Sequence, residues 1–284
     1  SPNAPSLHHQ LEERSMLIVG ERINTSRKVK GEPVIETAVK ARDAAFFIDL
    51  ASKQAEAGAQ YIDVNAGTLL DGEPEALEWL VTTIQGALDV QCTIDSPNPV
   101  AIERALRAHK GQAMLNSITM EKERYDNLLP LALEFETKVI SLCMGDGGIP
   151  TDAPGRIAVG RELVGNLKSA GVKADNIYLD PLVYPISMDS AYGMAVMETI
   201  RTMKSEFPDI HVTGGLSNIS HGLPQRKFLN QAFVVMCMAQ GLDSAIIDPM
   251  DKQLMALIYA AEALLGRDEF CAEYLTAARE GKFE

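Results

Sequence analysis

Four apolar stretches of the sequence end on polar side chains that can contact a ligand. Each is typical of a short buried strand followed at once by Asp or Asn. The stretches are residues 61–65, with Asp63 and Asn65; 92–95, ending on Asp95; 177–180, ending on Asp180; and 211–218, where Gly214 and Gly215 precede Ser217 and Asn218. Side chains at a strand's end contribute little to a core, so packing alone does not explain the pattern. We predict that the four strand ends form one site.

The residue types at these strand ends favour recognition of a planar nitrogen heterocycle. A carboxylate can accept two N–H bonds from an amidine-like edge, and an asparagine amide offers both donors and an acceptor. The candidate site has no histidine pair, no His-Glu-x-x-His and no cysteine cluster, so we expect no metal bound by this chain. The alternative interpretation of each Asp or Asn is a cap on the following helix.

The periodicity of apolar residues predicts how these side chains are positioned. Strands are expected at residues 16–20, 61–65, 91–95, 113–117, 138–144, 177–180, 211–215 and 244–248, with a polar loop at 21–26. Helices are expected at 36–57, 73–87, 99–108, 121–135, 154–170, 190–206, 222–240 and 252–265. Strict alternation implies a parallel sheet, and eight such units in about 250 residues predict a single-domain α/β fold, a (β/α)8 TIM barrel. Active sites of such barrels lie at the C-terminal strand ends, where the candidate residues fall.

Composition excludes several other classes of protein. Lys+Arg 26 against Asp+Glu 39 gives a net charge of -13, which works against binding to nucleic acid. No apolar stretch approaches the ~18 residues of a membrane span, so we expect no membrane partner. The four cysteines form no Cys-x-x-Cys pair, which fits a reducing, cytoplasmic location. Residues 1–15 are polar and aperiodic, and are predicted to be a flexible tail left by processing or preparation, outside a domain of residues 16–284.

Six short motifs along the chain carry a resemblance to a known family. They are Gly20-Glu21-Arg22-Ile23-Asn24, Asp63-Val64-Asn65-Ala66-Gly67, Ile94-Asp95-Ser96, Met114-Leu115-Asn116-Ser117, Asp180-Pro181-Leu182 and Gly215-Leu216-Ser217-Asn218-Ile219-Ser220. In order and spacing they resemble the pterin-binding barrels, and more closely the methyltetrahydrofolate:corrinoid protein methyltransferases of anaerobic one-carbon metabolism. The resemblance extends from Met16 to the C-terminus.

The resemblance implies transfer of a methyl group between N5 of tetrahydrofolate and the cobalt of a corrinoid (cobalamin) carried by a separate protein. By this likeness Asp95, Asn116 and Asp180 hold the pterin ring, and Asn218 is the catalytic residue that hydrogen-bonds near N5. A hydrogen bond that strengthens in the transition state suits a methyl transfer that needs few catalytic groups. Tetrahydrofolate or its 5-methyl form is then the substrate, the corrinoid protein is a partner, and a homodimer is expected.

Further residues are expected around the same ligand. By the resemblance these are Glu21, Asn24, Asp63, Asn65, Gly215 and Ser217, with Met144 lining the pocket and Arg226, eight residues past Asn218, at the mouth. For Asp63 and Asn65 the alternative is a role in holding neighbouring loops. For Glu21 the alternative is an internal ion pair with Arg22 at the rim of the barrel.

Two other functions are compatible with much of this pattern. Dihydropteroate synthase shares the barrel and a similar Asp-Asn-Asp set, but residues 215–218, Gly-Leu-Ser-Asn, stand where its lysine-bearing strand is expected. The other is a non-catalytic folate-binding subunit of a corrinoid complex. Residues 209–214 also spell Asp-x-His-x-x-Gly, a corrinoid-ligating pattern, which we interpret as a chance match because His211 enters a predicted strand. The sequence does not fix the direction of transfer, toward cobalt in acetyl-CoA synthesis or from it in demethylation.

Overall fold

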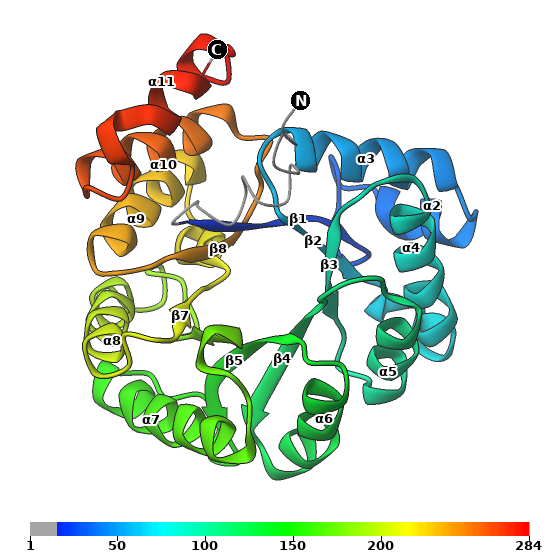
Figure 1. Cartoon of the computed structure of the whole chain (residues 1–284), viewed down its shortest axis with the longest axis horizontal. Helices are drawn as coiled ribbons and strands as arrows, with labels where there is room; N and C mark the ends of the chain where they lie inside the picture. The colour runs from blue at the N-terminus through cyan, green and yellow to red at the C-terminus, as the bar shows by residue number, and fades with distance from the viewer. Residues whose placement is uncertain (1–15, 284) are drawn as a thin grey trace, which may run out of the picture.

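The chain forms a ring of parallel strands inside a ring of helices (Figure 1) in the computed structural model, which describes residues 16–283. The strands are β1 (Leu17–Asn24), β2 (Tyr61–Asn65), β3 (Gln91–Asp95), β4 (Met114–Met120), β5 (Lys138–Gly145), β6 (Ile177–Asp180), β7 (His211–Val212) and β8 (Ser244–Ile247). They pair in parallel in the order β7-β6-β5-β4-β3-β2-β1-β8. The tail predicted at residues 1–15 lies outside the described residues.

The barrel closes on both sides of β8. On one side β8 pairs with β1, from Leu17 opposite Ser244 to Gly20 opposite Ile247. On the other side the Ile246 N–H donates to the Gly214 carbonyl at 3.0 Å, just past the end of β7. β7 is therefore shorter than the strand predicted at 211–215, because its continuation passes into the two glycines. Eight parallel strands in a nearly closed ring alternating with helices confirm the predicted single-domain (β/α)8 barrel.

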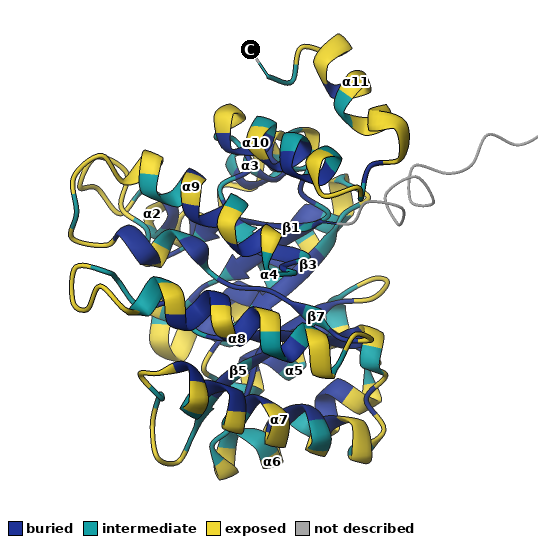
Figure 2. Ribbon diagram, turned by 90° about the vertical axis from the view of Figure 1, so that its left-hand side faces the viewer, coloured by how far each residue is buried: buried dark blue, intermediate teal, exposed yellow. Residues whose placement is uncertain are grey.

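Helices cover the outside of the ring. They are α2 (Val34–Lys40), α3 (Ala44–Glu56), α4 (Glu73–Ala87), α5 (Pro99–Ala108), α6 (Lys122–Glu134), α7 (Ala153–Ala170), α8 (Tyr192–Glu206), α9 (Arg226–Ala239), α10 (Lys252–Leu264) and α11 (Ala272–Arg279). Their inner faces are buried and their outer faces exposed (Figure 2). Burial of each Leu or Ile on these inner faces stabilises the fold by about 1.5–3 kcal/mol. Within residues 16–283 no helix is long and apolar enough to cross a membrane.

A second, smaller apolar cluster fills the inside of the barrel. It consists of Val19, Tyr61, Met114, Ile140 and Tyr178, one residue from each of five strands. Side chains two positions further along a strand face the same side. Beyond four members of this cluster those positions are Glu21, Asp63, Asn116 and Asp180. The apolar layer therefore forms the floor of a polar mouth at the C-terminal ends of the strands.

The single helix predicted at residues 36–57 is wrong, because the chain breaks between α2 and α3. Arg42 has a φ of 51°, in the left-handed region that a helix interior excludes. The carboxylate of Asp43 then accepts the Phe46 N–H at 3.1 Å and caps α3. The apolar spacing runs across both helices, so periodicity alone conceals the break.

The polar loop predicted at residues 21–26 is also wrong in part, because β1 continues to Asn24. Its register with β2 shifts between Gly20 and Ile23, so that Glu21 and Arg22 together lie opposite Asp63. An extra residue on one strand makes a β-bulge. A Cβ at Gly20 would lie 2.6 Å from Gln54 Oε1. That oxygen accepts the Arg22 N–H at 3.1 Å, so Gly20 gives the Gln54 side chain room to hold the bulge.

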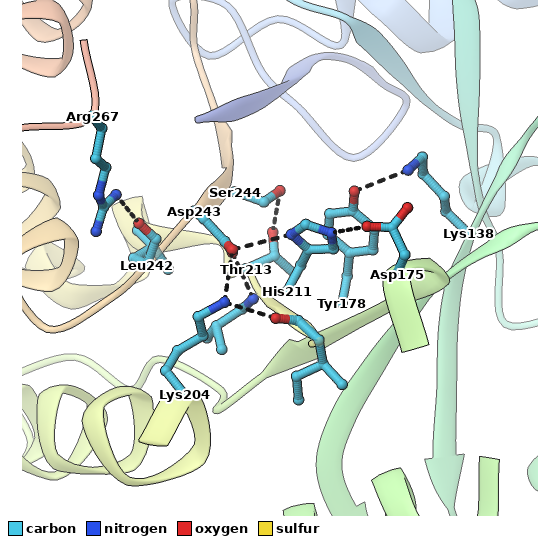
Figure 3. Close-up of polar contacts among 12 residues, drawn as sticks. Lys138, Asp175, Tyr178, Lys204, His211, Thr213, Leu242, Asp243, Ser244 and Arg267 are labelled. Carbon is cyan, nitrogen blue, oxygen red and sulfur yellow. Dashed lines mark hydrogen bonds and ion pairs between the residues drawn. The ribbon is translucent and has the colours of Figure 1, made fainter. Parts of the chain in front are cut away.

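Charged groups are paired at the amino ends of the strands (Figure 3). His211 contacts Asp243 through Nδ1 at 3.0 Å and Asp175 through Nε2 at 2.9 Å. Its ring stacks on Tyr178 with centroids 4.6 Å apart, and Lys204 Nζ donates to Asp243 at 3.0 Å. Both ring nitrogens of His211 are engaged, which agrees with the interpretation of Asp-x-His-x-x-Gly as a chance match.

We expect His211→Gln to destabilise the protein more at pH 6 than at pH 8.5. Burial lowers the pKa of His211, but hydrogen bonds and charges from Asp243 and Asp175 outweigh it and raise the pKa above the usual value. The stabilisation is therefore complete below the unfolded pKa of ~6.5 and is lost as the pH rises through the raised value. Urea unfolding at pH 6 should show a loss of about 2 kcal/mol, typical of hydrogen bonds to a charged group. An equal loss at both pH values would contradict a charged His211.

Candidate functional site

A row of amide and carboxylate side chains crosses four neighbouring strands at the mouth. Asn24 is level with Asn65, Asn65 with Asp95, and Asp95 with Asn116. Residues in register on parallel strands lie in one layer, so their side chains emerge side by side. Asp63 lies on the same strand face as Asn65, one layer deeper. The structure thus brings together five of the residues that the sequence predicts for the site.

Each inner asparagine of this row holds a carboxylate. Asn65 Nδ2 donates to Asp95 Oδ2 at 2.9 Å, while Asn65 Oδ1 accepts the Gly67 N–H at 2.9 Å. Asn116 Nδ2 donates to Asp63 Oδ1 at 3.3 Å. Within the described residues, each carboxylate has one oxygen hydrogen-bonded in this way and a second oxygen left for a ligand. The amides therefore set the direction in which the carboxylates can accept further N–H donors.

Burial removes water from around Asp63 and Asp95, and few hydrogen-bond donors replace it. It raises the pKa of Asp63, and the charge of Asp95 raises it further, against the hydrogen bond from Asn116. Burial also raises the pKa of Asp95, although the Asn65 hydrogen bond and the Arg124 charge act in the opposite direction. A desolvated carboxylate is ionised only when donors or positive charge compensate it. A ligand with N–H groups would supply that compensation.

Asp180 brings a third buried carboxylate to the mouth at the end of β6. Its Oδ1 accepts the Leu182 N–H at 2.7 Å, in a turn where Leu182 has a φ of 62°. Burial raises the pKa of Asp180 to about 6, with the Leu182 hydrogen bond and the Arg156 charge opposing the rise. A Cβ at Gly214 would lie 3.4 Å from Asp180 Oδ1, at van der Waals contact, so the chain after β7 passes directly beside the carboxylate.

Arg156, near the start of α7, is a site neighbour that the sequence did not reveal. The residue is 0% exposed, and its Nε donates to the Pro150 carbonyl at 3.2 Å. Its guanidinium carbon lies 5.8 Å and 6.0 Å from the ring centroids of Tyr184 and Tyr192. Neither Nη atom has a hydrogen-bond partner among the described residues. Arg156 thus places a buried positive charge beside Asp180, and no motif spacing distinguishes it from an ordinary helical arginine.

The chain after β7 presents an exposed asparagine at the mouth. Residues Leu216–Ser220 form a 3-10 turn, which the Asn218 N–H closes by donating to the Gly215 carbonyl at 3.3 Å. Asn218 is exposed, whereas the turn itself is braced from outside. Arg226 Nη2 donates to the Ser217 carbonyl at 2.8 Å. Arg226 therefore supports the turn that carries Asn218.

The rim between β1 and β8 carries a cluster of charges, in which the Glu21–Arg22 ion pair considered as the alternative for Glu21 is not formed. Arg22 Nη1 contacts Asp248 Oδ2 at 3.0 Å, while Arg27 lies 3.9 Å from Glu21 and 3.6 Å from Asp248. Burial raises the pKa of Glu21 to about 7, with the Arg27 charge as the largest opposing effect. Asp248 was not predicted for the site, yet it follows the apolar run 245–247 as the other strand-end residues follow theirs.

Asn24 has its side chain engaged in a turn, and Met144 lies on β5. Asn24 Oδ1 accepts from the Ser26 N–H at 2.9 Å and from the Ser26 hydroxyl at 2.7 Å, so this side chain closes a turn. Met144 is half-buried, two residues past Leu142, which pairs with Asp180. That register puts Met144 above Asp180 at the mouth. No group of three or more His, Cys, Asp or Glu within residues 16–283 is arranged to hold a metal ion.

Comparisons with known proteins show the family to which the chain belongs. The profile of a family described as "Pterin binding enzyme" matches residues 21–248. A methylcorrinoid:tetrahydrofolate methyltransferase of Eubacterium limosum is 36% identical over 269 residues, covering 94% of this chain and 97% of that protein. A Mycobacterium tuberculosis methionine synthase is 26% identical over 87% of this chain but only 22% of its own length. A 7,8-dihydropteroate synthase from Vibrio fischeri, with a TM-score of 0.65 at 16% identity over 88% of this chain and 93% of its own, shares the fold. This chain belongs to the pterin-binding enzyme family.

Proposed function

We propose that this protein transfers a methyl group from a methylated corrinoid protein to N5 of tetrahydrofolate. The observation that carries the proposal is the row of paired Asp and Asn side chains, with Asp180, around one desolvated barrel mouth. Family membership supports a pterin ligand. The printed name of the Eubacterium limosum relative supports both the substrates and the direction.

A pterin ring has the donors that the buried carboxylates lack. Its 2-amino group and N3–H form an amidine-like edge that can give two parallel N–H bonds to one carboxylate. Asp95 and Asp180 are the carboxylates, and Asn116 the amide, that we assign to the ring. Their raised pKa values reflect missing compensation in the free protein, which the ring would provide on binding.

Asn218 is the group that we assign to the chemical step. N5 becomes positively charged as its lone pair attacks the methyl carbon, and a hydrogen bond to a neighbouring amide oxygen then strengthens. Asn218 is exposed on a turn held by Gly215 and Arg226, so its amide is accessible to N5 of a bound ligand. In-line transfer between two bound partners otherwise depends mainly on positioning.

The proposal includes a corrinoid protein that docks at the mouth and presents its cobalt to N5. We also propose that the chain works as a homodimer in the cytoplasm. The resemblance to the family supports the dimer, and the four free cysteines support a reducing compartment. Whether the pathway is a demethylation follows from the identity of the original methyl donor, which the corrinoid partner determines.

Pteroate synthesis is the alternative that the structural neighbours raise. Their identity to this chain is 14–17%, which supports a shared fold and no shared substrate. Gly215 and Asn218 stand where that enzyme needs a lysine, and Arg226 braces a turn by way of Ser217. The structure therefore favours methyl transfer over condensation of a pterin pyrophosphate.

Isothermal titration with tetrahydrofolate, and separately with dihydropterin pyrophosphate, tests the ligand. We expect tetrahydrofolate to bind with a Kd of about micromolar, near −8 kcal/mol, and the pyrophosphate to bind at least about tenfold more weakly. Preferential binding of the pyrophosphate would move the function to pteroate synthesis. Folate binding without methyl transfer from any methylated corrinoid protein would leave a non-catalytic folate-binding subunit.

Asn218→Ala should separate catalysis from binding. We expect the single-turnover rate of methyl transfer to fall about 10²–10³-fold, the usual loss when one transition-state hydrogen bond is removed. The Kd for tetrahydrofolate should change little, because the carboxylates and Asn116 hold the ring. Stopped-flow absorbance of the cobalt reports the rate, and Asn127→Ala on α6 serves as the control. Transfer at the parent rate would refute the role of Asn218.

Asp180→Asn should stabilise the free protein at pH 8 while weakening tetrahydrofolate binding. A folded pKa of about 6 against a usual 3.8 means that ionised Asp180 destabilises the fold by about 1–3 kcal/mol at pH 8. The advantage of Asn should shrink as the pH falls through about 6 and vanish below ~3.8, because the parent Asp180 is then protonated in both states. Urea unfolding and titration on the same samples measure both effects. A variant that binds tetrahydrofolate as the parent does would show that Asp180 does not hold the ring.

A further inference from the structure

Glu21 is an acidic side chain at the mouth that the methyl transfer described above does not use. It follows Val19, a member of the apolar floor, by two positions and therefore faces the inside of the barrel. The bulge that Gln54 holds places Glu21 opposite Asp63, directly beside the row of site residues. Glu21 thus occupies the β1 side of the candidate site.

Glu21 and the turn that carries Asn218 lie on either side of β8. Val19 is paired with Ile246, and Ile246 is bridged to Gly215, after which the chain leaves the strand and forms the 3-10 turn Leu216–Ser220. Arg226 Nη2 donates to the Ser217 carbonyl at 2.8 Å in this turn, and the charge of Arg226 also lowers the pKa of Glu21. Arg226 therefore lies between the Glu21 carboxylate and the turn that carries the exposed amide.

Charges of both signs surround Glu21, but none of them holds its carboxylate in a close ion pair. The charged groups that face it are Arg22 on β1, Arg27 in the following loop, Asp63 on β2, Arg226 at the start of α9 and Asp248 after β8. Within residues 16–283 its nearest ion-pair partner is Arg27, 3.9 Å away, and its carboxylate makes no hydrogen bond. The side chain keeps 26% of its surface exposed. Glu21 is therefore buried enough for its pKa to rise, and exposed enough to exchange a proton.

We propose that Glu21 is the proton acceptor for N5 of tetrahydrofolate during methyl transfer. This inference rests on the proposed function and adds a group to it. The N5 lone pair forms a bond to the methyl carbon, and the cobalt–carbon bond breaks with its electron pair left on cobalt, which passes from Co(III) to Co(I). N5 is then positively charged and still bears its hydrogen. Glu21 takes that hydrogen as a proton, directly or through one water, and N5 becomes neutral.

The acidity of Glu21 suits this task near neutral pH. Burial raises its pKa to about 7, while Arg27, Arg226 and Arg22 keep part of the population ionised. A proton acceptor works best with a pKa close to the working pH. Asn218 cannot keep the proton, because an amide is far less basic than a carboxylate. The two residues therefore divide the work, with Asn218 orienting N5 and Glu21 removing its proton.

The test is the pH dependence of single-turnover transfer in both directions, for the parent protein and for Glu21→Gln. In the parent, transfer to tetrahydrofolate should become faster as the pH rises through about 7, because only ionised Glu21 accepts a proton. Transfer from 5-methyltetrahydrofolate to Co(I) should become slower over the same range, because protonated Glu21 must then supply the proton. Both pH trends should be absent in Glu21→Gln. Its rate of transfer to tetrahydrofolate at pH 8 should be about 10²-fold below that of the parent, the usual contribution of a general base.

Two further variants distinguish proton transfer from support of the fold. Glu21→Asp keeps a carboxylate and should retain the pH trends at a reduced rate. Glu75→Gln, an exposed change on α4, should match the parent in rate and profile. Tetrahydrofolate titration should give Kd values for Glu21→Gln within about threefold of the parent, under 0.7 kcal/mol.

The outcomes separate the two proposals. An active parent whose pH profile survives Glu21→Gln would overturn the role of Glu21 alone. A loss of tetrahydrofolate binding that matches the loss of rate would also overturn it, because Glu21 would then hold the ring. A parent that binds tetrahydrofolate but transfers no methyl group in either direction would overturn the proposed function and, with it, the proton acceptor.

Discussion

Burial of acidic side chains at one mouth of the barrel is the constraint on which the rest of the structure depends. Glu21, Asp63, Asp95 and Asp180 all have raised pKa values, and desolvation is the largest cause for each. Such groups weaken a fold unless other interactions offset them. The apolar floor beneath them and the helix–strand core around them provide that offset. The barrel is thus stable enough to hold carboxylates whose compensation arrives with a ligand.

Buried charged groups are compensated differently at the two ends of the barrel. At the amino ends, His211 lies between Asp175 and Asp243, and Lys204 adds a second positive charge to Asp243. At the carboxyl ends, Asp63 has an amide donor and, among residues 16–283, no cation within hydrogen-bond distance. A saturated network stabilises the fold, whereas an under-compensated one has free energy to gain from a ligand. This contrast is one reason, independent of any motif, why we propose the ligand site at the carboxyl ends.

Much of the fold and the row of site residues could be predicted, because both depend on local pattern. Apolar runs gave the strands, and a parallel barrel forces their polar ends together, so Asp95 and Asn116 followed from sequence. The division of helix 36–57 and the course of β1 to Asn24 could not be predicted, since a left-handed residue at Arg42 and a bulge at Glu21 leave the apolar spacing unchanged. The position of Arg156 near the site could not be predicted for another reason. Its importance depends on complete burial beside Asp180, which only tertiary packing determines.

The seam beside β7 shows how the fold combines closure with an exposed turn that carries Asn218. β7 has two residues, so few ladder hydrogen bonds hold it. Closure uses the Ile246 N–H bond to Gly214, the Asp243 N–H bond to Val212 and the hydrogen bond between the Ser244 and Thr213 hydroxyls. Gly214 also passes close to Asp180, because a Cβ there would lie 3.4 Å from the carboxylate, at van der Waals contact. The two glycines therefore carry the chain past Asp180 into the turn that presents Asn218, the residue to which we assign the chemical step.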